Sequence, residues 1–396
     1  MAGTKSVGCM LLGATALLLP LAAYAQTLTT LHSFTGEPDG DGPVGALIDV
    51  GGTLYGTTFT GGTHGAGTVF TIDPTTGAET VLHSFTGGGA GLYPEAALLN
   101  VSGTLYGTAA KGGTYDAGTV FAVNPATGAV KLVYSFAGGS DGQDPDAALI
   151  MVGGMLYGTT SGGGGATACD GEGCGTVFSV NPITGAETVL HAFTGKPDGA
   201  SPQAALLDVG GTLYGTSNIG GTYAKGTVFT VDPATGAEHV LYSFTGSTDG
   251  SNPAAALIDV GGTLYGTTGG GGKYDAGTVF TLDPATGAEN VLYSFAGGAN
   301  GDGGYPLAII DVGGTLFGTT YIGGTGGSGN GTVFAVNRMT GVETVLHSFS
   351  GGSDGDYPDA GLLRVGGTLY GTTLQGGSDD ASCGSTGCGT VFSLSR

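Results

Sequence analysis

The chain has 396 residues, of which 86 are glycine and none is tryptophan. The glycines follow no G-X-Y period and the mean hydropathy is +0.22, so the composition excludes collagen and argues against a disordered chain. The formal net charge of −22 argues against nucleic acid and anionic membrane surfaces as partners, and it is compatible with cations, neutral glycans or basic partners.

The first 25 residues predict a secretory signal peptide. Lys5 supplies the positive start, an apolar stretch follows, and Ala23-Tyr24-Ala25 is a small-residue cleavage motif before Gln26. Residues 26–396 then form the mature chain, whose 31 acidic and 8 basic residues give a net charge of −23. No later segment is apolar enough to span a bilayer. We therefore expect a secreted or extracytoplasmic monomer.

Residues 46–86 form the first complete copy of a repeated unit. ALIDV and TLYGTT are short apolar runs joined by Gly51-Gly52, which predicts a tight hairpin, because primed turns need positive φ. TVFTID is a third run, and the following Asp73-Pro74-Thr75-Thr76-Gly77 has turn chemistry. ETVLHSF is a fourth run. The third run does not alternate between apolar and polar residues, which favours a sheet covered on both faces, and Gly56 predicts close approach of the next blade.

The unit occurs seven times. A period near 50 residues built from four short β-type runs is typical of β-propeller blades. The steps between the aromatic residues of the LYG motif are 51, 51, 57, 51, 52 and 53 residues. These aromatic residues are Tyr55, Tyr106, Tyr157, Tyr214, Tyr265, Phe317 and Tyr370.

The two ends of the repeat region complement each other. Residues 27–34 match the fourth run only, whereas the chain stops after a third run at residues 389–396. The sequence therefore predicts an all-β, closed seven-bladed β-propeller with four antiparallel strands per blade, in which residues 28–34 complete the last blade. Closure also hides sheet edges that would otherwise promote aggregation. An open β-solenoid is the alternative, but it gives no reason for the complementary ends.

Four cysteines follow the predicted signal peptide, as two C-x4-C pairs. Cys169 with Cys174, and Cys383 with Cys388, each precede a GTVF run. In an exported chain such pairs predict local disulfides, each stabilising by roughly 2 kcal/mol through loop entropy. A zinc site is the alternative, but the pairs belong to distant repeats and no histidine lies beside either.

The loops that lead from the fourth run to the next unit are acidic and rich in glycine. Carboxylates separated by glycine can supply oxygen ligands to Ca²⁺. Asp-Gly is equally typical of an ordinary turn, and no complete twelve-residue calcium loop is present. The candidate calcium ligands are Asp39 and Asp41, then Asp141, Asp144 and Asp146, then Asp354 and Asp356.

The loops between the second and third runs open on the same face of the predicted propeller as the acidic loops. Four of them carry an aromatic residue at an equivalent place, and aromatic rings near carboxylates suit sugars or other neutral ligands. Packing of each ring over its own loop is the alternative. The candidate ligand-binding residues are His64, Tyr115, Tyr223 and Tyr274.

Two further sets of residues have structural interpretations. An aspartate before VGG is expected to cap its own turn; this set is Asp49, Asp208, Asp259 and Asp311. Histidine and tyrosine exchange in one slot of the fourth run, which indicates a packed ring with a polar tip rather than catalysis. That slot holds His32, His83, Tyr134, His191, Tyr242, Tyr293 and His347.

The units LYGTT, GTVF, D/NPxTG and VLHSF resemble the GloVer tandem-repeat family, an exported "choice-of-anchor" group, over residues 28–396. The resemblance implies export and, usually, a C-terminal surface anchor, but no established activity. This sequence ends with the repeat at Arg396, which favours a soluble secreted form. The repeats are also similar to those of quinoprotein propellers, but the repeat-ending tryptophan and an adjacent Cys-Cys are absent, so a pyrroloquinoline quinone enzyme is not expected.

The leading interpretation is a secreted, non-catalytic propeller that binds an extracellular glycan or protein through its loops; no cofactor is firmly implied, and Ca²⁺ is the candidate that the acidic loops suggest. No nucleophile motif, Ser-His-Asp arrangement or phosphate loop can be assembled, so no catalytic residue is predicted. An extracellular hydrolase or lyase that uses acidic loop residues is the first alternative. A structural surface protein is the second.

Overall fold

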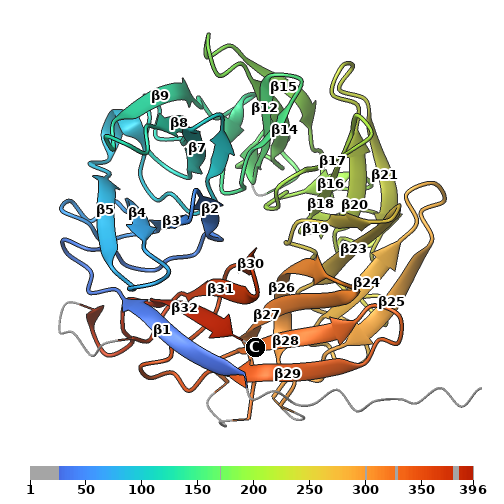
Figure 1. Cartoon of the computed structure of the whole chain (residues 1–396). Coiled ribbons are helices and arrows are strands. Elements are labelled where there is room, and N and C mark those ends of the chain that lie inside the picture. Colours follow the sequence, from blue (N-terminus) through green and yellow to red (C-terminus); the bar gives the residue numbers. More distant parts are fainter. Residues whose placement is uncertain (1–25, 170, 299–300, 326–328, 378–382, 396) are drawn as a thin grey trace, which may run out of the picture.

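The structure is a computed structural model that describes residues 26–169, 171–298, 301–325, 329–377 and 383–395. The predicted signal peptide, residues 1–25, lies outside the described residues. Seven four-stranded antiparallel sheets are arranged in a ring about a central axis (Figure 1), and this arrangement confirms the predicted seven-bladed propeller. Each sheet runs from an innermost first strand to an outermost fourth strand.

The strands of blades 1 to 4 follow one pattern. Blade 1 is β2 Ile48–Val50, β3 Thr53–Thr58, β4 Thr68–Ile72 and β5 Glu79–Ser84. Blade 2 is β6 Leu99–Val101, β7 Thr104–Ala109, β8 Thr119–Val123 and β9 Val130–Ser135. Blade 3 is β11 Ile150–Val152, β12 Met155–Thr160, β14 Thr176–Val180 and β15 Glu187–Ala192. Blade 4 is β17 Leu207–Val209, β18 Thr212–Ser217, β20 Thr227–Val231 and β21 Glu238–Ser243.

Blades 5 to 7 complete the ring. Blade 5 is β22 Ile258–Val260, β23 Thr263–Thr268, β24 Thr278–Leu282 and β25 Glu289–Ser294. Blade 6 is β26 Gly304–Val312, β27 Thr315–Ile322, β28 Thr332–Asn337 and β29 Glu343–Ser348. Blade 7 is β30 Leu363–Val365, β31 Thr368–Thr373, β32 Thr390–Ser395 and β1 Thr27–Ser33. The loops contain two short two-stranded sheets, β10 Gly142–Gln143 with β13 Gly162–Gly163 and β16 Gly199–Ala200 with β19 Ile219–Gly220, and one 3₁₀ turn, η1 Gly88–Ala90.

The first strand of the chain closes the ring, as its sequence predicts. β1 pairs antiparallel with β32, from Thr27 opposite Ser395 to Ser33 opposite Thr390. Beyond the strand, the Phe34 amide donates to the Gly389 carbonyl at 3.0 Å. Blade 7 therefore takes three strands from one end of the chain and its outermost strand from the other.

The predicted turns form as their residues require. Gly51 and Gly52 have φ of 65° and 89°, as a primed hairpin turn demands. Asp49 accepts the Gly52 amide at 2.9 Å, and Asp208 and Asp259 do the same in their blades. Asp311 differs, because it faces the Arg338 guanidinium, with Nε 3.6 Å from Oδ1.

A glycine is required in each second strand for a different reason from the one that the sequence suggested. A Cβ at Gly56 would lie 2.5 Å from the ring of Phe70 and 2.9 Å from Leu47. Both side chains belong to the same blade, and Phe70 is the residue paired with Gly56 across the sheet. The expectation that Gly56 allows approach of the next blade is therefore wrong; it makes room for a ring of its own blade.

The core lies between blades rather than inside one sheet. At every seam, by which we mean the contact between two consecutive blades, the phenylalanine that ends the fourth strand packs edge-on against the third-strand phenylalanine of the next blade. Phe34 and Phe70 at the seam of blades 7 and 1 are 5.0 Å apart and fully buried. Each blade thus needs both neighbours to bury its apolar side chains.

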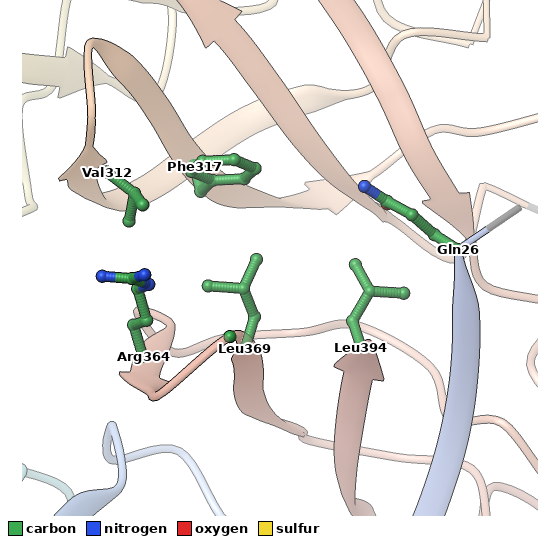
Figure 2. A pocket seen from close by; sticks show the side chains of 7 residues that line it. Gln26, Val312, Phe317, Arg364, Leu369 and Leu394 are labelled. Atoms are coloured by element: carbon green, nitrogen blue, oxygen red, sulfur yellow. The ribbon is translucent and has the colours of Figure 1, made fainter. Parts of the chain in front are cut away.

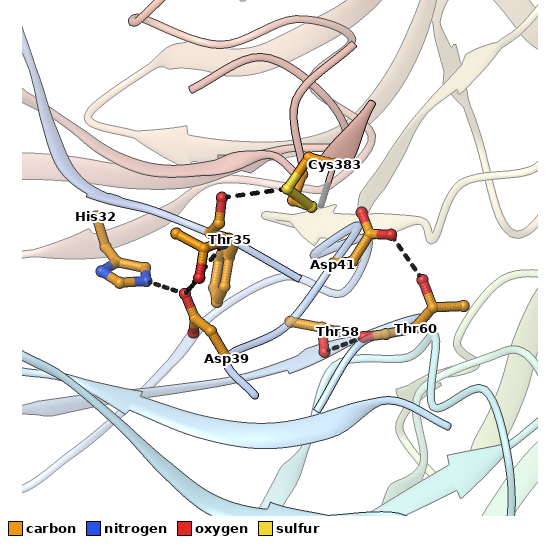
Figure 3. Close-up of a disulfide and its surroundings, with 9 residues drawn as sticks. His32, Thr35, Asp39, Asp41, Thr58, Thr60 and Cys383 are labelled. Atoms are coloured by element: carbon orange, nitrogen blue, oxygen red, sulfur yellow. Dashed lines mark hydrogen bonds and ion pairs between the residues drawn. A yellow bond between two sulfur atoms is a disulfide. The ribbon is translucent and has the colours of Figure 1, made fainter. Parts of the chain in front are cut away.

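Both predicted disulfides are present. Cys169 bonds Cys174, and Cys383 bonds Cys388, in the second-to-third loops of blades 3 and 7. Figure 3 shows the second bond beside the N-terminal segment, where Cys383 Sγ lies 3.8 Å from the Phe34 carbonyl oxygen. Disulfides fit an oxidising, extracytoplasmic compartment. Within the described ranges, no helix is both long and apolar enough to cross a membrane.

Candidate functional site

Because the seven sheets share one strand order, the loops that enter the first strands all lie on one face of the ring, and by the channel mouth we mean the surface that these loops form. A proline in every one of these loops packs on the glycine of the preceding blade's GTVF motif; Pro253 Cδ, for example, lies 2.4 Å from the place of a Cβ at Gly226. The residue before the proline has positive φ in all seven loops and donates its amide to a carbonyl of the preceding blade. Strained backbone that is repeated and well held is typical of functional surfaces.

Three carboxylates, those of Glu95, Asp146 and Asp359, directly follow these prolines in the sequence. Burial raises the pKa of Asp146 and of Asp359 to about 7. Burial also raises the pKa of Glu95, with a further contribution from the charge of Asp144. Glu95 acts on both aspartates, so carboxylates from blades 2, 3 and 7 are near neighbours. The Lys111 ammonium pairs with Asp144 at their edge.

Two stacked pairs of aromatic rings flank these carboxylates. Phe59 and Tyr93 stack with centroids 4.6 Å apart, and Tyr93 precedes Pro94 and Glu95. Tyr321 and Tyr357 stack at 4.9 Å. Burial, followed by the charge of Asp359, raises the pKa of Tyr321. Each pair is thus associated with one mouth carboxylate.

The seven repeats differ from one another at this mouth, as they also do in the second-to-third loops and in the His/Tyr slot of the fourth strand. The packing phenylalanines, the GTVF glycine and the loop proline are the same in all seven copies. By contrast, the residue before the proline is Gly42, Tyr93, Asp144, Ser201, Asn252, Tyr305 or Tyr357. The residue after it is Val44, Glu95, Asp146, Gln203, Ala254, Leu307 or Asp359. Divergence of such loops on a repeated scaffold is expected where a ligand with no sevenfold symmetry binds.

The aromatic residues predicted from the sequence lie away from the mouth. Tyr115, Tyr223 and Tyr274 are exposed by 65%, 55% and 49%, and His64 is exposed as well. Their loops are tied to the outer strands; the Thr114 amide, for instance, donates to Ser135 Oγ at 2.8 Å. The four residues therefore stand on the rims of four separate blades, and their predicted role in binding stays a prediction.

The predicted calcium ligands lie in several places. Asp39, Asp141 and Asp354 turn outward, where they accept hydrogen bonds from the fourth-strand histidine or tyrosine and from nearby loop amides. Asp41 accepts a hydrogen bond from Thr60 Oγ1 at 3.0 Å, Asp356 pairs with Gln375 through its backbone, and Asp144 and Asp146 belong to the mouth. Figure 3 shows Asp39 and Asp41 directed at different partners. Calcium binding by these aspartates stays a prediction.

The outward aspartates belong to a seam motif that the sequence analysis did not identify. The polar tip of the fourth-strand ring meets an aspartate of the following loop and the glutamate that begins the next blade's fourth strand. Tyr242 Oη lies 3.0 Å from Asp249 Oδ2 and 3.4 Å from Glu289 Oε2. Complete motifs are His32–Asp39–Glu79, Tyr134–Asp141–Glu187, His191–Asp198–Glu238, Tyr242–Asp249–Glu289 and Tyr293–Asp302–Glu343.

The seam glutamates are poorly accommodated as anions. Burial, and then repulsion by the aspartate of the same motif, raises the pKa of Glu289 to about 7, and the same two causes raise the other four to about 7. Their Oε1 atoms are buried without a hydrogen-bond partner: Glu79, Glu187, Glu238, Glu289 and Glu343. A protonated glutamate suits these positions better than a carboxylate.

Stability should therefore fall as pH rises from about 4.5 to above 7. A group whose pKa is raised on folding stabilises fully below its unfolded value and loses that contribution as pH rises through its folded value. Because the seams are half-exposed, solvent reduces the effect to about 0.5 kcal/mol for each glutamate, or about 3 °C in melting temperature for all five. Thermal melts at pH 5.5 and 8.5, with chelator present, measure the difference.

The control is the triple variant Glu187→Gln, Glu289→Gln and Glu343→Gln, which cannot ionise at the three tyrosine seams. It should lose about half of the pH-dependent fall, since the mouth carboxylates and the two histidine seams still titrate. An unchanged fall would contradict the assignment to the seams.

Two pockets lie outside the channel mouth. A cavity of about 80 Å³ between blades 6 and 7 is lined by Val312, Phe317, Leu369 and Leu394, with Arg364 and Gln26 at its edge (Figure 2). It is smaller than the roughly 300 Å³ that small-molecule sites need. An open groove of about 430 Å³ on blade 4 is lined in part by Asp198 and Glu238. Neither pocket contains a mouth carboxylate.

Comparison with known proteins identifies the family of the repeat and supports the fold. The family model of the Gloeobacter/Verrucomicrobia repeat matches residues 17–171 and 165–392. The extracellular domain of a protein described as a hybrid two component system from B. thetaiotaomicron has a TM-score of 0.58 at 12% identity, covering 94% of this chain and 43% of that one. An extracellular domain described as part of a one component system from that organism gives 0.56 at 12% identity, covering 93% and 41%.

These likenesses show the fold alone, and the chain spans less than half the length of those two structures. No curated protein matches the chain.

Proposed function

The chain belongs to the Gloeobacter/Verrucomicrobia repeat family, and from that premise we propose that it is a secreted binding protein whose ligand, an oligosaccharide, lies over the mouth of the channel. The proposal rests on one observation, the divergence of otherwise near-identical repeats at the mouth. Export is supported by the predicted signal peptide and by the two disulfides.

The chemistry of the mouth suits a sugar. The faces of stacked rings provide flat apolar surfaces for the C–H faces of sugar rings, and carboxyl and amide groups bind hydroxyls. The Phe59–Tyr93 and Tyr321–Tyr357 pairs belong to blades 1 and 6 and the loops that follow them, so each pair is next in the ring to a loop that carries a mouth carboxylate. Amides are present too, since Asn218 donates to Gln203 Oε1 at 2.8 Å. A chain of several sugar units would reach both ring pairs.

A glycan array with residues 26–396 tests the proposal. Tyr93→Asn and Tyr357→Asn remove one ring of each pair and introduce a residue that the chain itself uses at this position with positive φ, Asn252. Each should weaken binding of the selected glycan by about tenfold to a hundredfold. Tyr115→Ala, Tyr223→Ala and Tyr274→Ala are matched controls on the rim and should leave binding unchanged. Loss of binding in the rim variants alone would move the site to the sequence-predicted residues.

A second candidate function, glycan cleavage by hydrolysis or by a lyase reaction, follows from the raised pKa of Asp146 and Asp359. A carboxyl group that stays protonated near pH 7 can act as a general acid beside an ionised one. The discriminating measurement is product formation from array-positive glycans by the wild type and by Asp146→Asn. Binding without product supports the binding protein, whereas products that disappear in the variant support the enzyme.

A further inference from the structure

The seams with histidine differ from the seams with tyrosine in one respect. A tyrosine hydroxyl reaches both acids of its motif in two seams, as Tyr134 does with Asp141 and Glu187. The histidines reach only the aspartate: His32 Nε2 and His191 Nε2 each lie 3.1 Å from an aspartate Oδ2. Glu79 and Glu238, like the glutamates of the tyrosine seams, keep a buried Oε1 with no partner. A ligand that accepts lone pairs from all three groups would complete these two seams.

We propose that His32–Asp39–Glu79 and His191–Asp198–Glu238 are two equivalent binding sites for a divalent transition metal ion of the zinc type. One imidazole nitrogen and two carboxylate oxygens provide three protein ligands, which leaves coordination positions for water. In each set the three ligand atoms lie within 4.8 Å of one another. Zinc–ligand distances of about 2.0–2.2 Å require the three ligand atoms to draw closer together than this upper limit when an ion binds.

The surroundings hold the histidine ring and leave a path for the ion. Each ring packs edge-on against the buried phenylalanine two residues later, with centroids 4.8 Å apart for His32–Phe34 and for His191–Phe193. The side chains of His191 and Asp198 keep 21% and 12% of their surface exposed. Asp198 and Glu238 also line the open groove of blade 4, so an ion can enter from solvent.

The remaining seams are built-in controls. In the seam of His83, Ala90 and Val130 stand at the positions of the aspartate and the glutamate, so this seam has neither acid. His347 bonds Asp354 at 3.1 Å, but Leu28 occupies the place of the glutamate, opposite Leu394 in the sheet. The three tyrosine seams have both acids but no nitrogen ligand. Among the described residues, only the two proposed sites combine a histidine with two carboxylates in this way.

Zn²⁺ titration of residues 26–396, freed of metal with chelator, tests the sites by stoichiometry. Two ions should bind to the wild type, one to His191→Tyr, and none to the double variant His32→Tyr and His191→Tyr. These variants copy the tyrosine seams, so the fold should be retained. Tyr242→His places a histidine beside Asp249 and Glu289 and should raise the count to three, whereas His347→Tyr should leave it at two.

Visible absorption after loading with Co²⁺ gives a second measurement, because d–d bands report coordination by the protein rather than loose binding to the acidic surface. The intensity of these bands should rank the variants in the same order as their zinc counts. If Tyr242→His does not fold, judged by circular dichroism, Tyr134→His serves in its place. Equal zinc counts in the wild type and the double histidine variant, or no gain in the folded tyrosine-to-histidine variant, would overturn the proposal.

Discussion

Removal of residues 26–36 is expected to abolish most of the stability of the ring. The deletion takes away β1 and leaves the edge of β32 unpaired along six registered residues. It also removes Phe34, which is fully buried against Phe70. Loss of a buried phenylalanine alone costs about 3–5 kcal/mol, and with the sheet pairing the total approaches the whole stability of a typical domain. We expect a melting temperature lower by more than about 10 °C, measured by circular dichroism.

A circular permutant separates loss of the strand from loss of chain length. It would begin at residue 37, run to Ser395 and turn through a short linker into residues 26–36. Thr27 and Ser395 already face each other. In the permutant, the four strands of blade 7 are therefore consecutive in the sequence, as they are in the other six blades. It should melt close to the full mature chain. A truncated chain that melts like the mature chain would refute closure by β1.

Gly226→Ala is expected to destabilise the protein by about 4 kcal/mol, or about 5 °C in melting temperature. Gly226 has φ of 94°, which a residue with a Cβ seldom adopts. Its Cβ would also lie 2.4 Å from Pro253 Cδ and 2.5 Å from the Ser217 carbonyl oxygen. The neighbouring atoms are a proline ring and backbone, which cannot rotate away.

Gly261→Ala is the matched control for this substitution. Gly261 also has positive φ, 65°, but no atom lies within 4 Å of its would-be Cβ. The change should cost about 1 kcal/mol. The difference between the two variants measures the close approach of blade and loop, and equal melting temperatures would contradict it.

The strands and the closure could be predicted from the sequence because each depends on local chemistry repeated seven times. Gly51-Gly52 and Asp73-Pro74 determine their turns within a few residues. The complementary ends identify the partner of β1 without any knowledge of distance. The reason for Gly56 was missed, because the choice between Phe70 and the next blade depends on side-chain packing that apolar patterning does not show.

The candidate sites were harder to predict, because their members come from different blades. Glu79 and His32 are in neighbouring blades and far apart in the sequence, and neither is unusual in its own strand. A signal was nevertheless present: the seam that lacks the aspartate, at Ala90, also lacks the glutamate, at Val130. Comparison of the repeats position by position would also have indicated the variable mouth. It would have given less weight to Tyr115 and Tyr223, which recur as an exposed rim feature.

The position of β1 has a consequence for how the chain acquires its structure. Thr27 and its partner Ser395 lie 368 positions apart in the sequence. Six blades can form from neighbouring segments, but blade 7 needs residues 390–395 before β1 has a partner. Contacts of such long sequence separation slow folding, and an unpaired strand is open to aggregation until they form. The ring-completing step is therefore where a chaperone would have its largest effect on yield.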